Sequence, residues 1–266
     1  MLDFFNNYFF APEGTHPKCG IFTAPHLISL VICIAIIGVC VYFSRNISKK
    51  GLTLITRVMA FVFTALELIK IFFKFKNNAV YQLDHWLPLA FCSLFIYTLW
   101  MSGYGKGLIK KLGDMYIVGG CFCGGLAFLI FPLTSFNITP IYHFLSMHSM
   151  LFHSCMVYMA IMYIYKGVER VDLKSYKYYF FFVGGAAVLS VIINTITIFM
   201  PDVNPANLMI MRELFGFPLD FVNQFTKDFP WIYTPIAFAV YTLVPYFIVY
   251  GFLKLVAKIR GKKKEN

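Results

Sequence analysis

Seven apolar segments, each close to the length that crosses a bilayer, constrain this chain more than any other feature. They cover about residues 24–44, 53–75, 86–104, 114–133, 139–165, 176–200 and 230–256. A transmembrane helix needs about 20 mainly apolar residues. Only 13% of the residues are charged, against about 25% in soluble domains. The sequence therefore predicts an all-α polytopic membrane protein, with residues 1–266 forming a single seven-helix transmembrane bundle.

The basic residues are distributed unequally between the loops. Sixteen of the 23 Lys and Arg residues fall in one alternate set of loops and the C-terminal tail, and five fall in the other set. Cytoplasmic loops carry an excess of Lys and Arg, so we expect an outside N-terminus and a cytoplasmic C-terminus. Because the net charge of +11 resides in short loops between apolar segments, it indicates topology and not nucleic-acid binding. The long connection 201–229 is then external, and we expect it to cap the bundle.

A polar stripe marks the fifth apolar segment. Tyr142, Ser146, Ser149 and His153 follow one another at spacings of 4, 3 and 4 residues, which places them on one face of a helix. Ionisable groups at membrane depth are costly and usually face the interior of a bundle. The stripe therefore predicts the wall of a polar site, with His153 as its deepest titratable group.

Other apolar segments carry polar groups at comparable depth. Glu67 and Lys70 share a face of the second segment, Cys92 lies in the first turns of the third, and His148 belongs to the fifth. A cavity that opens outward would satisfy all of them. Three alternatives stay open: Glu67 and Lys70 neutralise one another as an i,i+3 pair, the histidines only bond neighbouring helices, and Cys92 packs as a small apolar residue.

No motif for a metal or a cofactor is present, so we expect neither. The sequence contains no HExxH, no CxxC and no paired carboxylates, which are the usual signs of such sites. Cys121 and Cys123 lie in the stretch GGCFCGG, where the small residues Gly120 and Gly124 predict close helix packing.

Four motifs, taken in order over roughly residues 50–250, resemble the YwaF-type integral membrane proteins, whose eukaryotic branch is the transmembrane protein 164 acyltransferases. Leu87-Pro88 opens a helix with Cys92 in its first turns, and His153 stands thirteen residues before Lys166-Gly167. The segment 202–207, with sequence DVNPAN, follows the sixth apolar segment, and Phe229-Pro230-Trp231 opens the last one.

The resemblance implies a compact helical bundle with an intramembrane histidine site. Eukaryotic members move fatty acyl chains between phospholipids with a Cys and a His, and the histidine corresponds to His153. Directly after the proline, the eukaryotic pattern has Cys and then His, and these positions are Leu89 and Ala90 here. Bacterial-type members resemble this chain in placing a Cys four residues after the proline, at Cys92, which also implies a bacterial plasma membrane.

Two functions follow from these observations. The first is an acyltransferase or lipase-like hydrolase that acts on membrane lipids, with His153 as base and Cys92 as nucleophile. The second is a non-catalytic carrier that binds a lipid or a solute in the same cavity. The residues expected to bind the substrate are Glu67, Lys70, His148, Ser149, Asn204 and Asn207.

Overall fold

The computed structural model describes residues 2–76, 83–201, 203–214 and 219–262. Within these ranges the regular structure is entirely helical. Six helices are long and apolar enough to cross a membrane: α2 (Ala24–Ser44), α3 (Lys49–Lys76), the composite helix Gly107–Phe136, α9 (Phe144–Tyr165), α10 (Tyr176–Ile198) and α12 (Pro230–Lys262). The protein is therefore an integral membrane protein, as the apolar segments predicted.

The predicted third span, 86–104, is not a continuous helix. It consists of α4 (Leu83–Trp86), an irregular segment over 87–93, and α5 (Leu94–Tyr104). Pro88 has no N–H to donate and disfavours helical geometry at the residue before it. The prediction that a helix opens at Leu87-Pro88 was wrong, and Cys92 instead lies in a turn ahead of α5. The 11 residues of α5 rise only about 16 Å.

The irregular backbone before α5 lies inside the protein. Its carbonyl at Phe91 accepts a hydrogen bond from the hydroxyl of Tyr116, and Phe91 is 7% exposed. Non-helical backbone at membrane depth is tolerated only where protein or a water-filled cavity satisfies its polar groups. The bundle thus contains the short helix α5 beside the six long helices. The irregular segment that leads into α5 is stabilised by the Tyr116 side chain of α6 (Gly107–Tyr116).

The composite helix contains α6 (Gly107–Tyr116), the π-helical segment η2 (Ile117–Cys121), α7 (Phe122–Ile130) and α8 (Leu133–Phe136). A Cβ at Gly119 would lie 2.6 Å from the ring of Tyr246, and one at Gly124 would lie 2.9 Å from Phe91. Cys121 is completely buried. The glycines of this stretch therefore allow close helix packing, as expected.

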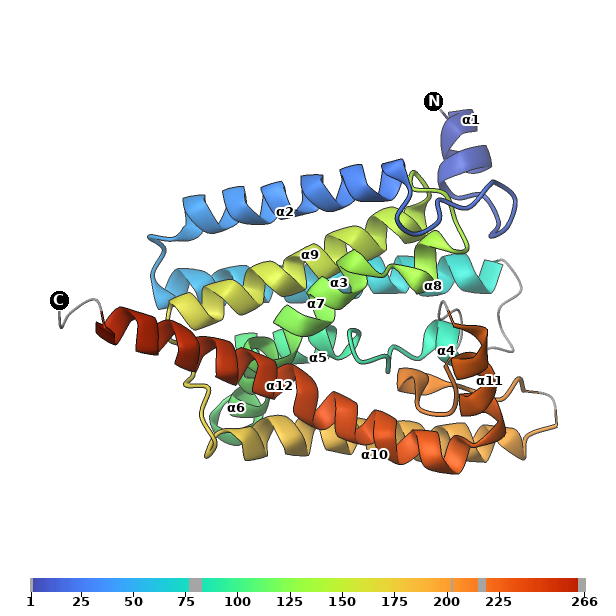
Figure 1. The fold of residues 1–266 in the computed structure, drawn as a ribbon. Coiled ribbons are helices and arrows are strands. Elements are labelled where there is room, and N and C mark those ends of the chain that lie inside the picture. The colour runs from blue at the N-terminus through green and yellow to red at the C-terminus, as the bar shows by residue number, and fades with distance from the viewer. Residues whose placement is uncertain (1, 77–82, 202, 215–218, 263–266) are drawn as a thin grey trace.

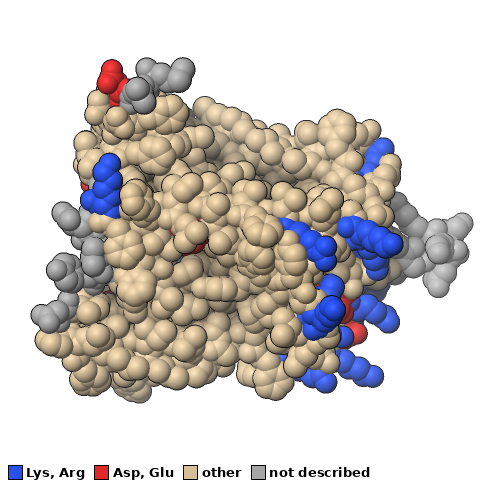
Figure 2. Space-filling view, turned by 180° about the vertical axis from the view of Figure 1, so that it is seen from behind, with Lys and Arg blue, Asp and Glu red and all other residues tan. Residues whose placement is uncertain are grey.

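Contacts between the loops define two ends of the bundle. At one end the ammonium of Lys49 donates to the carbonyl of Gly167 at 2.7 Å, and Lys111 lies 3.8 Å from Glu169. At the other end Lys74 pairs with Glu13 of the N-terminal segment. Figure 2 shows the Lys and Arg side chains gathered mainly at one end. This clustering agrees with the loop asymmetry, while the orientation in the membrane stays a prediction.

The long helices are buried to very different degrees. In the most apolar 18-residue stretch of α9, 72% of the residues are buried inside the protein, whereas in that of α2 only 11% are buried. Figure 1 shows α2 along one side of α9, with α3 and α7 close to α9 and with α10 and α12 on the far side of the bundle. The helix with the polar stripe is therefore the most enclosed of the six.

The predicted external cap, 201–229, contains the short 3-10 turn η3 (Leu208–Ile210) and α11 (Asp220–Asp228). It follows α10 and packs on the ends of α10 and α12 (Figure 1). Asp202, the first residue of the DVNPAN motif, lies outside the described residues, as do residues 215–218 of the predicted cap.

Candidate intramembrane histidine site

His153 lies in the middle of α9 and is 7% exposed. Its Nδ1 atom is 2.7 Å from the carbonyl oxygen of Ser149, one turn earlier. Its ring stacks on that of Phe128 in α7, with 3.7 Å between the ring centroids and an angle of 8° between the ring planes. A carbonyl can only accept, so Nδ1 carries the proton and Nε2 keeps its lone pair. Among the described residues, Nε2 has no hydrogen-bond partner. His153 thus presents a fixed ring with one basic nitrogen unused.

Two other histidines are held differently. His26 donates from Nε2 to the carbonyl of Leu129 at 3.0 Å and accepts at Nδ1 from the N–H of Phe22 at 2.9 Å. His143 donates from Nε2 to the carbonyl of Ala11 at 2.9 Å and caps α9 by accepting from Leu145 at 3.2 Å. Both nitrogens of each ring are occupied. His143 therefore serves as a hydrogen-bonding residue, although its partner Ala11 lies in the N-terminal segment and not in a neighbouring helix.

Glu67, Lys70 and His148 lie together between α3 and α9. The carboxylate of Glu67 and the ammonium of Lys70 form an ion pair at 2.5 Å, and Glu67 is 6% exposed. His148 is 8% exposed, and its buried Nε2 has no hydrogen-bond partner among the residues that the structure describes. Lys70 interacts electrostatically with both His148 and His153. The ion pair between Glu67 and Lys70 is thus observed, and His148 takes no part in it.

Cys92 lies against α7 and not against His153. Its thiol donates to the carbonyl of Gly124 at 3.8 Å, and no hydrogen bond joins it to His153 in the part of the chain described. Gly124 and Phe128 are four residues apart on α7, which is about 6 Å along the helix axis. The thiol and the imidazole therefore contact the same helix about one turn apart.

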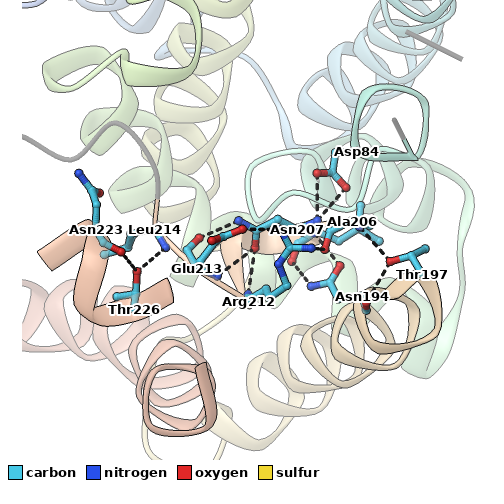
Figure 3. A network of polar contacts seen from close by, with 11 residues as sticks. Asp84, Asn194, Thr197, Ala206, Asn207, Arg212, Glu213, Leu214, Asn223 and Thr226 are labelled. Carbon is cyan, nitrogen blue, oxygen red and sulfur yellow. Dashed lines mark hydrogen bonds and ion pairs between the residues drawn. The ribbon is translucent and has the colours of Figure 1, made fainter. Parts of the chain in front are cut away.

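Asn207 belongs to a separate polar network in the external cap (Figure 3). The backbone N–H of Asn207 donates to both carboxylate oxygens of Asp84, at 2.9 and 3.0 Å. The side chain of Asn207 donates to the carbonyl of Glu213 at 2.7 Å and accepts from the N–H of Arg212 at 2.9 Å. Asn204 is exposed. Asn207 therefore holds a loop closed, and no hydrogen bond joins it to His153 in the described part of the chain.

Asp84 is a member of this network that the sequence analysis did not select. Burial raises the pKa of its carboxyl group, while the hydrogen bond from Asn207 and the charge of Arg212 lower it. Arg212 in turn pairs with Glu213 and donates to the carbonyl of Ala206 at 3.1 Å. Nothing in the sequence near residue 84 indicates a partner 123 residues away.

Asn194 connects α10 to the cap, and its replacement by Ala is expected to loosen the loop. Its side chain is 4% exposed, accepts from the N–H of Leu208 at 2.8 Å and donates to the carbonyl of Leu208 at 3.2 Å. Removing it leaves the N–H of Leu208 without its partner, at a cost of about 1–3 kcal/mol. The carbonyl of Leu208 loses one of two donors and keeps the N–H of Met211 at 3.2 Å. Limited proteolysis of the cap should become faster in Asn194→Ala.

The matched control for this prediction is Thr195→Val. Thr195 is exposed, and within the described ranges its hydroxyl bonds only to the carbonyl of Val191 in its own helix, at 2.8 Å. Cleavage of Asn194→Ala at the rate of wild type and of Thr195→Val would show that the cap is held by other contacts.

Comparison with known proteins finds one family. The model of the TMEM164 family matches residues 21–250, a region that contains His153, Cys92 and the network of the external cap. No curated protein and no solved structure matches the chain.

Proposed function

Because this chain belongs to the TMEM164 family, we propose that it is a membrane-embedded enzyme that acts on lipid esters, as an acyltransferase or a lipase-like hydrolase. The proposal includes the finer expectations from the sequence: a YwaF-type member, with the segment before α5 completing a seventh crossing, an outside N-terminus, and a bacterial plasma membrane as its location.

The observation that carries the proposal is the state of His153. A general base needs an unprotonated nitrogen that can reach the substrate, and its ring must be held in one orientation. The bond from Nδ1 to Ser149 at 2.7 Å and the stack on Phe128 at 3.7 Å supply the orientation. The free Nε2 supplies the base, which His26 and His143 lack because both of their nitrogens are bonded.

In the proposed reaction Nε2 of His153 takes a proton from the nucleophile, which is the Cys92 thiol in a transferase. The sulfur bonds to the ester carbonyl carbon, and the carbonyl electron pair moves to oxygen. When this intermediate collapses, the ester C–O bond breaks and the leaving alcohol takes the proton from the imidazolium. A hydroxyl of a second lipid, or water in a hydrolase, then attacks the thioester carbonyl carbon while His153 takes its proton. The C–S bond breaks, and the Cys92 thiolate takes that proton back from the imidazolium.

The conformation of the Cys92 side chain decides whether its thiol can take part in these reaction steps. In the structure its thiol is directed to the carbonyl of Gly124, so the nucleophilic role requires rotation of the side chain toward His153. A buried thiol is inert unless a base activates it. In a hydrolase without a thioester, His153 activates water directly and Cys92 has only a packing role.

The experiment that tests the function uses the purified full-length protein in detergent. Phosphatidylcholine with a labelled acyl chain is supplied together with an unlabelled lysophospholipid, and the products are followed by mass spectrometry. Transfer of the label to the lysophospholipid identifies an acyltransferase, and labelled free fatty acid identifies a hydrolase. Lipid profiles equal to those of the heat-denatured protein would overturn both.

Replacing Cys92 by Ser tests the thioester step. Acyl transfer should fall by about 10²-fold or more, as expected when a nucleophile is removed, and the labelled acyl-enzyme should disappear from the intact-protein mass spectrum. Cys155→Ser is the matched control, because Cys155 is a free, half-buried cysteine two residues after His153. Full transfer by Cys92→Ser would assign Cys92 to packing.

The non-catalytic carrier remains the second candidate, and one observation favours it. Glu67, Lys70 and His148 form a polar cluster between α3 and α9, with the Nε2 of His148 unpartnered, and such groups in membrane proteins often bind a solute or relay protons. The same assay separates the two functions, since a carrier would retain lipid while leaving every ester bond intact.

A further inference from the structure

A cavity of about 670 Å³ lies between α10, the segment 205–213 and the start of α12. A second hollow of about 360 Å³ shares Val191 and Pro235 with it and continues to Val188 and Phe238. Neither is lined by His153 or Cys92. Figure 1 shows α10 and α12 on the far side of the bundle from α9. The two hollows together form a groove, called here the α10–α12 groove, that is separate from the histidine site.

The walls of the α10–α12 groove are apolar along most of its length. On α10 it runs from Val188 through Val191 to Ile198, which is about 15 Å at 1.5 Å per residue. Ile192 and Ile198, which also line it, are 49% and 53% exposed, so the groove opens toward the surface that faces lipid. Its dimensions and lining suit an acyl chain.

The polar groups are gathered at one end of the groove. Lys227 of α11 is exposed and has no ion-pair partner in the described part of the chain, while Arg212 pairs with Glu213. Trp231, in the first turn of α12, is 72% exposed, and Trp residues are enriched at membrane–water interfaces. This end therefore lies at the depth where lipid phosphates are found.

The polar groups deeper in the groove already have partners. The side chain of Asn194 is used by Leu208, and the hydroxyl of Thr234 donates to the carbonyl of Met211 at 2.8 Å. Among the described residues that line the groove, a ligand would thus find charge only at Lys227, Arg212 and Glu213, and apolar surface below them. A free solute or a polar peptide does not match this distribution.

We propose that the α10–α12 groove binds a glycerophospholipid, with the phosphate at Lys227 and Arg212 and one acyl chain along Val191 and Val188. The cationic end meets the phosphate at headgroup depth, and the apolar walls replace lipid contacts along the chain. The site is independent of ester chemistry at His153, since the two lie on different helices.

Native mass spectrometry of the full-length protein in detergent tests this site. The protein is titrated with palmitoyl-oleoyl phosphatidylglycerol and, in parallel, with dioleoylglycerol, which lacks the phosphate. Lys227→Gln should weaken phosphatidylglycerol binding about fivefold, the effect of one basic residue near a lipid surface, and leave dioleoylglycerol unaffected. Val191→Phe, which fills both hollows, should weaken binding of both lipids.

Two matched variants control for general effects. Lys18→Gln removes an exposed cation that does not line the groove, and Ile196→Phe enlarges a residue of α10 that is 54% exposed and also outside the groove. Both should bind like wild type, and thermal melting checks that all four variants are folded. Equal affinity of wild type for the two lipids, or unchanged binding in folded Val191→Phe, would overturn the proposal. His153→Asn should bind phosphatidylglycerol normally, which separates this site from the proposed enzyme.

Discussion

Replacement of His153 by Asn should lower ester turnover by about 10²–10⁴-fold, the usual contribution of a general base. The amide of Asn can keep an N–H directed at the carbonyl of Ser149, where Nδ1 now lies at 2.7 Å. What the substitution removes is Nε2. The expected loss is therefore in turnover, with little change in the melting temperature, and the labelled-lipid assay and thermal melting measure the two effects side by side.

The matched control is His26→Gln. His26 is also buried, at 0% exposure, and bonded to a backbone carbonyl, that of Leu129. The Gln amide can preserve that contact, and because neither nitrogen of His26 is available as a base, turnover should stay at the wild-type level. If folded His153→Asn turned over lipid as fast as wild type and His26→Gln, His153 would not be the base.

Replacement of Gly125 by Ala is expected to give the largest loss of stability among the variants proposed for this protein. A Cβ there would lie 2.6 Å from Cγ2 of Val157 and 2.8 Å from the carbonyl oxygen of His153. A backbone oxygen cannot move aside as a side chain can, so α7 and α9 must separate. Overpacking of this kind costs about 1–3 kcal/mol, which exceeds the gain of about 1 kcal/mol from helix propensity. The melting temperature in detergent should fall, and turnover with it.

Gly185→Ala provides the comparison for Gly125→Ala. Gly185 lies within α10, and a Cβ added there would meet no atom within 4 Å. This variant should melt at or above the wild-type temperature. A Gly125→Ala protein that melted like Gly185→Ala would show that α7 and α9 can shift without cost.

The third predicted crossing shows where hydropathy stops being informative. Residues 86–104 are apolar enough to cross a bilayer as one helix, yet α5 begins only at Leu94. The irregular backbone before it depends on Tyr116, which bonds the carbonyl of Phe91 from 25 residues away. Hydropathy counts apolar side chains and does not record which backbone groups a distant residue will satisfy.

The candidate site was found only in part from the sequence. Helical spacing identified His153 on a polar stripe, and the i,i+3 spacing of Glu67 and Lys70 correctly indicated an ion pair, observed at 2.5 Å. Asn207 was expected to line the same site as His153, but its contacts lie in the cap, and no local pattern in the sequence indicates them. Its side chain is used within the cap by Glu213 and Arg212, and its backbone is bonded to Asp84.

The sequence by itself determined that this is a helical membrane protein. The length and composition of each apolar segment are local properties, and they suffice to show whether that segment can cross the hydrocarbon core as a helix. It also determined which loops carry positive charge. Only the tertiary structure decided which histidines keep a free nitrogen, because the carbonyls that bond His26 and His143 lie 103 and 132 residues away in the chain. The α10–α12 groove likewise exists only where helices distant in sequence fail to fill the space between them.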